Sequence, residues 1–302
     1  MGQRYIPRLA IFFLALSALM MGGCGKAAAP ATQAAAVTVA STVPAATDMI
    51  LEMGAGDHLV AVSNLEGSKK GIEALPHIGD YQSIDWEKLA QVRPKVLIVQ
   101  INPARMPAGI AENAHKFGMR LLNLHIERLN DTFTALDQIG DALDERPKAA
   151  AAGKKLHDKL DAVKARVAGE GRVPTLVFTN EGEQGCAGRD NFVNDMLEIA
   201  GGENVLKSRF GSWPSVDREM IASLKPQAVL ELLPNAKPIE KENSRRFWQT
   251  MEQVPAVRDA RVYLLSQSFV LLPGIHVGET TELFANCLHP VANGNPASKD
   301  AP

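Results

Sequence analysis

The sequence predicts an α/β protein of two lobes, in which mainly parallel sheets are covered by helices and one long α-helix joins the lobes. Short apolar runs alternate with helical patterns on both sides of a charged helical stretch at residues 130–168, which is typical of βαβ units. A helix–proline–strand unit also occurs once in each alternating region. The chain has 302 residues, 46% of them hydrophobic, and is long enough to form two such cores.

The first alternating region extends from residue 37 to residue 124. Its apolar runs have the length of buried strands, and the segments between them have helical spacing. Strands are expected at residues 37–42, 59–62, 96–99 and 120–124, and helices at residues 45–53, 85–91 and 107–117. Gly54-Ala55-Gly56 ends the first helix and lacks the third glycine of a dinucleotide fingerprint, so we interpret it as a turn.

The charged stretch is rich in Ala, Lys, Leu, Asp and Glu and contains no strand-like run. Its apolar residues, for example Leu156 and Leu160, recur at helical spacing. Pro147 is expected to divide or kink this helix.

Alternation then resumes in the second region. Strands are expected at residues 173–178, 228–232 and 262–265, and helices at residues 191–200, 217–224 and 279–288. Gly201-Gly202 follows the first of these helices, where a glycine can adopt the left-handed conformation of a C-terminal cap.

The internal repeat is the strongest signal. Asp217 lies 132 residues after Asp85, and Pro226 lies 132 residues after Pro94. Each aspartate can cap the first free N–H groups of a helix, and an apolar residue before the cap can pack on the fourth helical residue. Each proline ends its helix before an apolar strand. The agreement of all these features at one offset makes chance a poor explanation.

The N-terminus has the pattern of an export signal. Arg4 and Arg8 precede an apolar run that ends at Met21 and is shorter than the ~20 residues needed to cross a bilayer. Met21-Gly22-Gly23-Cys24 resembles the lipobox of bacterial lipoproteins, which implies cleavage before Cys24 and a diacylglycerol on its thiol.

These patterns divide the chain into six segments. They are a lipoprotein signal peptide at 1–23, a tether at 24–36, an N-terminal α/β lobe at 37–128, the bridging helix at 129–171, a C-terminal α/β lobe at 172–290 and a disordered tail at 291–302. Export places Cys186 and Cys287 in an oxidising compartment, where a disulfide and two unpaired buried thiols both fit the sequence.

The repeat resembles the substrate-binding proteins of bacterial ABC importers for cobalamin, siderophores and haem. Val43-Pro44-Ala45-Ala46-Thr47, Gly188-Arg189-Asp190-Asn191-Phe192 and Trp213-Pro214 also fit this family, and the likeness extends from about Val37 to about Pro290. Lys95 and Gln227 are departures, because the family often has aspartate there. The resemblance implies a ligand cleft between two lobes that a long helix bridges, with only small closure on ligand.

The resemblance also implies a function and partners. It indicates a monomer, lipid-anchored at Cys24 on the periplasmic face of the bacterial cell envelope, that delivers cobalamin or an iron chelate to an inner-membrane permease and its ATPase. Glu87 and Glu219 match the family's pair of exposed acids, which meet arginines of the permease. The alternative is that both are only favourable charges in a first helical turn. No intrinsic cofactor and no catalytic residue is implied.

Cleft residues are expected in loops at the carboxyl ends of the strands. In cobalamin-binding members, aromatic residues precede the two repeats, which indicates Tyr81 and Trp213 as walls for a large flat chelate. Trp213 also fits a role in packing between the lobes. The further candidates are Pro44, Ala45, Gln100, Asn180, Arg189, Gln267 and Phe269.

The sequence leaves three ligands as alternatives: cobalamin, a ferric siderophore and haem. Gln267 and Leu271 stand where the cobalamin binders have Asp and Arg, which weighs against cobalamin. Arg189 could offer charge to an anionic siderophore, although the role of an ordinary surface arginine fits it better. Haem would need an axial ligand such as Tyr81, His77 or His276.

Other functional classes were weighed as well. A carrier of bare Zn²⁺ or Mn²⁺ needs histidines and carboxylates that converge on one ion, whereas the seven histidines are scattered. An extracytoplasmic enzyme would be unusual without a nucleophile elbow, a metalloprotease motif or a phosphate loop. A receptor that reports ligand to a sensor fits the same sequence. The net charge of −2, with no long basic run, argues against nucleic acid as a partner.

Overall fold

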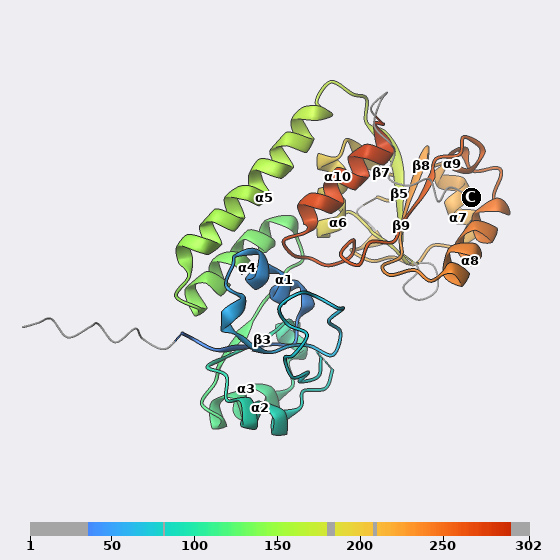
Figure 1. The fold of residues 1–302 in the computed structure, drawn as a ribbon. Coiled ribbons are helices and arrows are strands. Elements are labelled where there is room, and N and C mark those ends of the chain that lie inside the picture. The colour runs from blue at the N-terminus through green and yellow to red at the C-terminus, as the bar shows by residue number, and fades with distance from the viewer. Residues whose placement is uncertain (1–35, 81, 180–184, 208–209, 291–302) are drawn as a thin grey trace, which may run out of the picture. The chain divides into compact units, whose positions relative to one another are not determined.

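Two mainly parallel β-sheets with helices on their faces form the framework of the protein (Figure 1). The computed structural model describes residues 36–80, 82–179, 185–207 and 210–290, all within one compact unit. The predicted signal peptide, Cys24, most of the tether and the predicted tail lie outside the described residues, and so do Tyr81 and Asn180. Within the ranges described, no helix is both long enough and apolar enough to cross a membrane.

The first half contains a four-stranded sheet in the order β2-β1-β3-β4. All its pairings are parallel, and both β1 and β3 are buried along their whole length, so each face of the sheet must be covered. The strands are β1 (Val39–Ser41), β2 (Leu59–Ala61), β3 (Val96–Val99) and β4 (Arg120–Asn123). The helices are α1 (Pro44–Glu52), α2 (Trp86–Val92) and α3 (Ala108–Lys116), with short 3₁₀ turns η1 (Gly56–His58) and η2 (Pro103–Arg105).

The second half contains a sheet in the order β6-β5-β8-β9, with β7 also paired to β5. Only the β5–β6 pairing is antiparallel. The strands are β5 (Val173–Thr179), β6 (Gly185–Cys186), β7 (Gly202–Asn204), β8 (Ala228–Leu232) and β9 (Val262–Leu265). The helices are α6 (Phe192–Ile199), α7 (Arg218–Leu224), α8 (Pro238–Gln249), α9 (Pro255–Arg258) and α10 (Val277–Leu288). The predicted α/β class with two mainly parallel sheets is confirmed.

The repeat is visible in the local geometry of both halves. The carboxylate of Asp85 accepts a hydrogen bond from the backbone N–H of Lys88 at 3.0 Å, and Asp217 accepts one from Met220 at 2.7 Å. Helix α2 ends at Arg93 with φ 52°, and α7 ends at Lys225 with φ 50°, again 132 residues apart. These left-handed C-caps immediately precede the two prolines. Each helix therefore ends in the same way, and the chain turns back into its strand in the same way.

The helical segment predicted at residues 129–171 is not one continuous helix, and its division close to Pro147 agrees with the break expected there. The segment forms two packed helices, α4 (Leu129–Ala142) and α5 (Arg146–Arg166). Asp144, with φ 59°, reverses the chain between them, and Pro147 lies in the first turn of α5, where its missing N–H costs nothing. A Cβ on Gly140 would come within 2.5 Å of the Ala149 side chain, so the two helices touch closely at this glycine.

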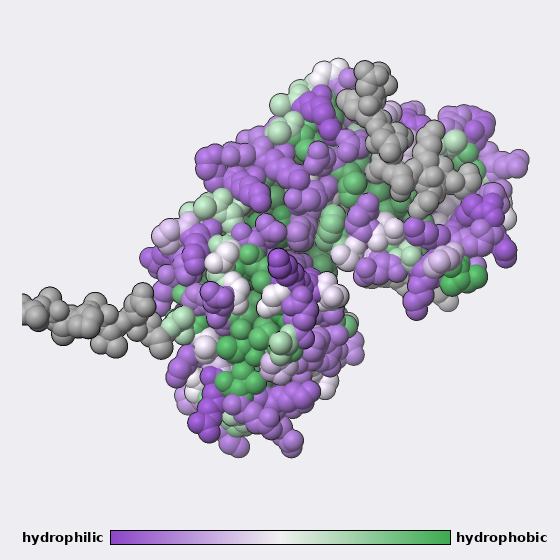
Figure 2. Space-filling view, viewed as in Figure 1, coloured by the Kyte–Doolittle hydropathy of each residue, from purple (hydrophilic) through white to green (hydrophobic). Residues whose placement is uncertain are grey.

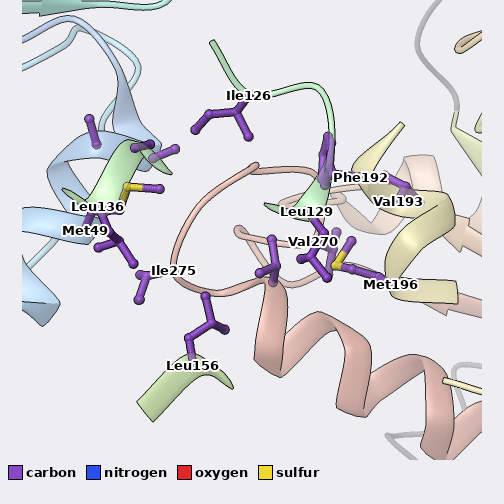
Figure 3. Packing of buried hydrophobic residues seen from close by; sticks show 14 of the residues in the cluster. Met49, Ile126, Leu129, Leu136, Leu156, Phe192, Val193, Met196, Val270 and Ile275 are labelled. Carbon is purple, nitrogen blue, oxygen red and sulfur yellow. The ribbon is translucent and has the colours of Figure 1, made fainter. Parts of the chain in front are cut away.

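One apolar core runs through both halves by way of this helical pair. It joins residues of β1 and α1 to residues of α4, α5, α6 and α10. Figure 3 shows Ile275, which precedes α10, between Met49 of α1 and Leu156 of α5. Because protein interiors are close-packed, such a contact holds the two halves at a defined spacing.

The two cysteines of the described part are both buried and unpaired. Burial raises the pKa of the Cys186 and Cys287 thiols to about 12. Of the two alternatives for these residues, the structure therefore favours separate buried thiols, which are inert at neutral pH.

A second apolar core lies behind β8 and contains a buried carboxylate. Glu231 is 1% exposed, and burial raises its pKa. The Trp248 indole N–H of α8 donates a hydrogen bond to it at 2.7 Å, and the Ser244 hydroxyl donates to the same oxygen. Helix α8, which the sequence analysis did not predict, is thereby fixed against the sheet.

We predict that Trp248→Phe lowers the free energy of unfolding by about 1–3 kcal/mol, because it leaves the Glu231 carboxylate with a single donor. Urea denaturation followed by circular dichroism measures this loss. Trp86→Phe is the control, since Trp86 is partly exposed and stacks on Phe117 with the ring centroids 6.2 Å apart. If the two variants lower the free energy of unfolding equally, the hydrogen bond from Trp248 to Glu231 does not stabilise the fold in this way.

Candidate ligand-binding cleft

A cavity of about 660 Å³ lies between the two halves, within the size range of small-molecule sites. Its first wall comes from α1, the loop after β1 and the loop at residues 65–69, and its second wall comes from the loops after β8 and β9. In Figure 2 the visible face of the molecule is hollowed where the two halves meet. The described lining residues are Thr42, Val43, Pro44, Ala45, Asp48, Leu65, Gly67, Ser68, Lys69, Gln100, Pro234, Asn235, Ser268, Leu271, Leu272 and Pro273.

The lining follows from the direction of the strands. Thr42 comes directly after β1, Gln100 directly after β3, and Pro234 shortly after β8. The carboxyl ends of parallel strands meet at one edge of each sheet, so the cavity forms where these two edges face each other. Three of the residues singled out from the sequence, Pro44, Ala45 and Gln100, belong to this lining.

Two other predicted residues lie beside the cavity on the β9 side. Gln267 is half-buried next to the lining residue Ser268, and its amide oxygen is buried with no hydrogen-bond partner in the described structure. Phe269 packs on the shared core, with its ring centroid 5.2 Å from that of His276.

Trp213 and Arg189 lie in the second half but outside the lining of this cavity. Trp213 is 50% exposed and lies 6.3 Å from the ring of Phe192, so it is not the buried packing residue of the alternative interpretation. Arg189 donates hydrogen bonds to the backbone carbonyls of Leu206 and Asn204. In this structure Arg189 therefore stabilises the chain around β7 and does not line this cavity.

A charged triad forms part of the first wall. The Lys69 ammonium lies 2.7 Å from a carboxylate oxygen of Asp48 and 2.7 Å from one of Glu66. The side chains of Asp48 and Glu66 are only 9% and 1% exposed, and the second oxygen of Glu66 has no partner in the described structure. Lys69 thus holds the loop at residues 65–69 down on α1.

The protonation of Lys69 reflects this arrangement. Burial opposes its charge, but hydrogen bonds to Asp48 and Glu66 outweigh burial, so the pKa of Lys69 is raised. Lys69, the cation of the described lining, is therefore already paired with two carboxylates at the cavity wall. Sequence reasoning missed both Lys69 and Asp48, although an aspartate within the mostly apolar helix at residues 45–53 was a usable signal.

The two acids of the repeat lie at the starts of α2 and α7. Glu87 and Glu219 are both exposed, each in the first turn of its helix, and neither lines the cavity. His77 is also exposed, while His276 contacts carboxylates rather than the cavity.

Comparison with known proteins identifies the family. A family model described as "Periplasmic binding protein" matches residues 39–268. The chain belongs to the periplasmic binding protein family. It is therefore a substrate-binding protein of ABC transport and not an enzyme.

Individual relatives agree with this assignment. The chain is 24% identical over 235 residues to a vitamin B12-binding protein of Vibrio parahaemolyticus, covering 78% of this chain and 83% of the relative. It is 22% identical over 307 residues to the uncharacterized ABC transporter substrate-binding lipoprotein YvrC of Bacillus subtilis, covering 92% and 95%. The structure of the periplasmic heme-binding protein HutB of Vibrio cholerae superposes with a TM-score of 0.73 at 18% identity, covering 84% and 99%.

We predict that Lys69→Met destabilises this binding protein by about 1–3 kcal/mol, because two buried carboxylates lose their shared cation. Urea denaturation at pH 7 measures the change in the free energy of unfolding. Lys70→Met, at the exposed neighbouring residue, is the matched control and should change stability little. A wild-type denaturation midpoint for Lys69→Met would show that the triad does not hold the loop.

Proposed function

We propose that this periplasmic binding protein captures cobalamin or an iron chelate, either haem or a ferric siderophore, and delivers it to a membrane permease. The observation that carries the proposal is the cavity of about 660 Å³, built from strand ends of both halves. Relatives named as vitamin B12-binding and heme-binding proteins support this class of ligand. A carrier of bare metal ions has less support, because no group of three or more His, Cys, Asp or Glu among the described residues could hold an ion.

The chemistry of the lining favours a ligand with a neutral surface. Its cation Lys69 is already paired with Asp48 and Glu66, and the remaining polar groups, such as Gln100, Asn235 and Ser268, are neutral donors and acceptors. Leu271 and Leu272 add apolar surface opposite α1. Amide- or hydroxyl-bearing edges fit this wall better than free carboxylates, which would lie close to Asp48 without an unpaired cation in the described lining.

Trp213 supplies an aromatic surface at the same edge of the second sheet. The neighbouring Pro214 carbonyl accepts a hydrogen bond from the N–H of Cys186 in β6, which pairs with the carboxyl end of β5. A half-exposed indole loses water when a flat ligand covers it. We assign Trp213 to the ligand on this basis.

We predict that cobalamin, haem or a ferric siderophore quenches tryptophan fluorescence in a saturable way. Trp213→Ala should weaken binding of the effective ligand by about 1–3 kcal/mol through lost aromatic contact. Trp86→Ala is the matched control, because Trp86 stacks on Phe117 away from the lining residues. An unchanged dissociation constant for Trp213→Ala removes this residue from the site, and no binding within the whole panel contradicts the proposed ligand class.

The delivery step requires recognition of the loaded protein by its permease. Glu87 and Glu219 are exposed, and equivalent positions of the repeat place one on each half. Two separated acids on one rigid body can fix the orientation of docking and accelerate encounter with a basic surface. We infer that they bind arginines of an ABC permease whose ATPase drives uptake.

We predict that the double variant Glu87→Ala, Glu219→Ala keeps its affinity for ligand but loses transport. The acids lie outside the cavity lining, so the dissociation constant should not change. Uptake of radiolabelled ligand by cells that depend on this protein measures transport. The double variant Glu112→Ala, Glu252→Ala, at other exposed acids, controls for loss of charge alone. A parallel loss of ligand binding would place the acids in the cleft or the fold instead.

The proposed function also implies where in the cell the protein acts. The family functions outside the cytoplasm, and the relative YvrC is described as a lipoprotein. We infer that Cys24 carries the lipid that holds the protein at the periplasmic face of the membrane, near its permease.

A further inference from the structure

A series of charged side chains links the cavity wall to the helix that bridges the two halves. Lys69 binds Asp48 of α1, Asp48 lies 3.9 Å from His276, and His276 lies 3.7 Å from Glu279 of α10. Glu279 lies 3.0 Å from Lys159 of α5. The series therefore starts in the first half at the cleft, crosses to the second half at His276 and ends on α5.

His276 is the member of this series that crosses between the halves. Its Nε2 faces Asp48 of the first half and its Nδ1 faces Glu279 of the second half. The side chain is 27% exposed, and its ring lies against Phe269. The opposite orientation of the two nitrogens allows a protonated imidazole to interact with both carboxylates at once.

The backbone beside His276 is held against the first half. A Cβ on Gly274 would meet the Cβ of Ala45 at 3.1 Å and its carbonyl oxygen at 3.3 Å, so only a residue without a side chain fits easily. Ile275 fills the space between Met49 and Leu156 (Figure 3). Any separation of the halves must therefore pull His276 away from Asp48.

The charges that face His276 come from three packed elements. Asp48 and Glu52 belong to α1 and Glu279 to α10, while Lys159 belongs to α5. The Lys155 ammonium of α5 is 3.5 Å from the Glu52 carboxylate, and both residues line a small pocket beside His276. We call this contact region between the halves the joint. Glu279 first, and then Asp48 and Glu52, raise the pKa of His276 against the opposing effect of burial. His276 first, and then Lys159, lower the pKa of Glu279 to about 2.

We propose that protonated His276 is a latch between the halves, which couples the cleft wall at Lys69 to α5 and narrows the range of spacings that the cleft adopts. Loss of the proton loosens this latch and broadens the range of spacings. The inference deepens the proposed function, and it rests on that function only for the identification of the cavity as the ligand site.

The direction of the pH dependence follows from the two pKa shifts. The folded pKa of His276 lies above its unfolded value of 6.5, so its stabilisation is complete below pH 6.5 and is lost as pH rises through the raised pKa. The pKa of Glu279 falls from 4.5 to about 2, so its stabilisation is complete above pH 4.5 and is lost as pH falls towards 2. The latch is therefore fully formed between about pH 4.5 and 6.5.

The spacing of the halves can be measured directly without any ligand. Spin labels at Ala111→Cys of α3 and Gln253→Cys of the second half occupy exposed positions, and Cys186 and Cys287 are buried. Pulsed electron resonance in a Cys24→Ser background gives the distribution of distances between the labels. The distribution should be narrow at pH 6.0 and broader at pH 8.5, and His276→Gln should be broad at both values.

Matched variants make the outcome decisive. His157→Gln, at an exposed histidine of α5 that pairs with Asp161, should behave like the wild type. The Tm of the wild type should fall between pH 6.0 and 8.5 by about 2–4 °C more than that of His276→Gln. If His276→Gln does not fold, Glu279→Gln tests the same link from the second half. A narrow distribution at pH 6.0 for either variant overturns the latch, and because no ligand is added, that result is independent of the fluorescence titration.

Discussion

The packing of Gly274 and Ile275 against the first half is the contact on which the cleft depends. Gly274 approaches the backbone of Ala45, and Ile275 lies among side chains of α1 and α5. Both residues precede α10, whose own apolar face belongs to the same core. The segment that lines the cavity at Pro273 therefore continues directly into the joint. A shift of the joint by the width of a methyl group would change the distance between the two walls of the cavity.

The elements of this fold could be predicted because their causes are local. Strands β3, β8 and β9 coincide with the predicted ranges, since each is a short, mostly apolar run that begins directly after a polar residue. The starts of α2 and α7 follow from capping aspartates that act within three residues. Helices α8 and α9 were missed because few of their residues face the core, although each has proline in its first turn.

The site was harder to predict because its contacts join distant parts of the chain. Pro44 and Gln100 could be located from strand direction alone, since any residue just after a parallel strand lies at the same edge. The pairing of Lys69 with Asp48 has no such rule, because it depends on the path of an irregular loop. The hydrogen bonds of Arg189 could not be predicted for the same reason: backbone carbonyls near β7 satisfy its guanidinium, and no sequence pattern marks an acceptor of that kind.

Where the two halves meet around Ile275 and His276, apolar and ionic contacts have different effects, and both suit a binding protein. Apolar packing around Ile275 is insensitive to pH and fixes the mean spacing of the walls, which lowers the ordering cost that a bulky ligand would otherwise meet. The side chains of His276 and Glu279 are partly exposed, so their ion pair contributes little by itself to stability. The geometry of these contacts is specific, however, because the single imidazole of His276 faces one carboxylate from each half. A joint built from packing alone would hold the cleft at one width, whereas the added charges allow that width to respond to its surroundings without any loss of the core.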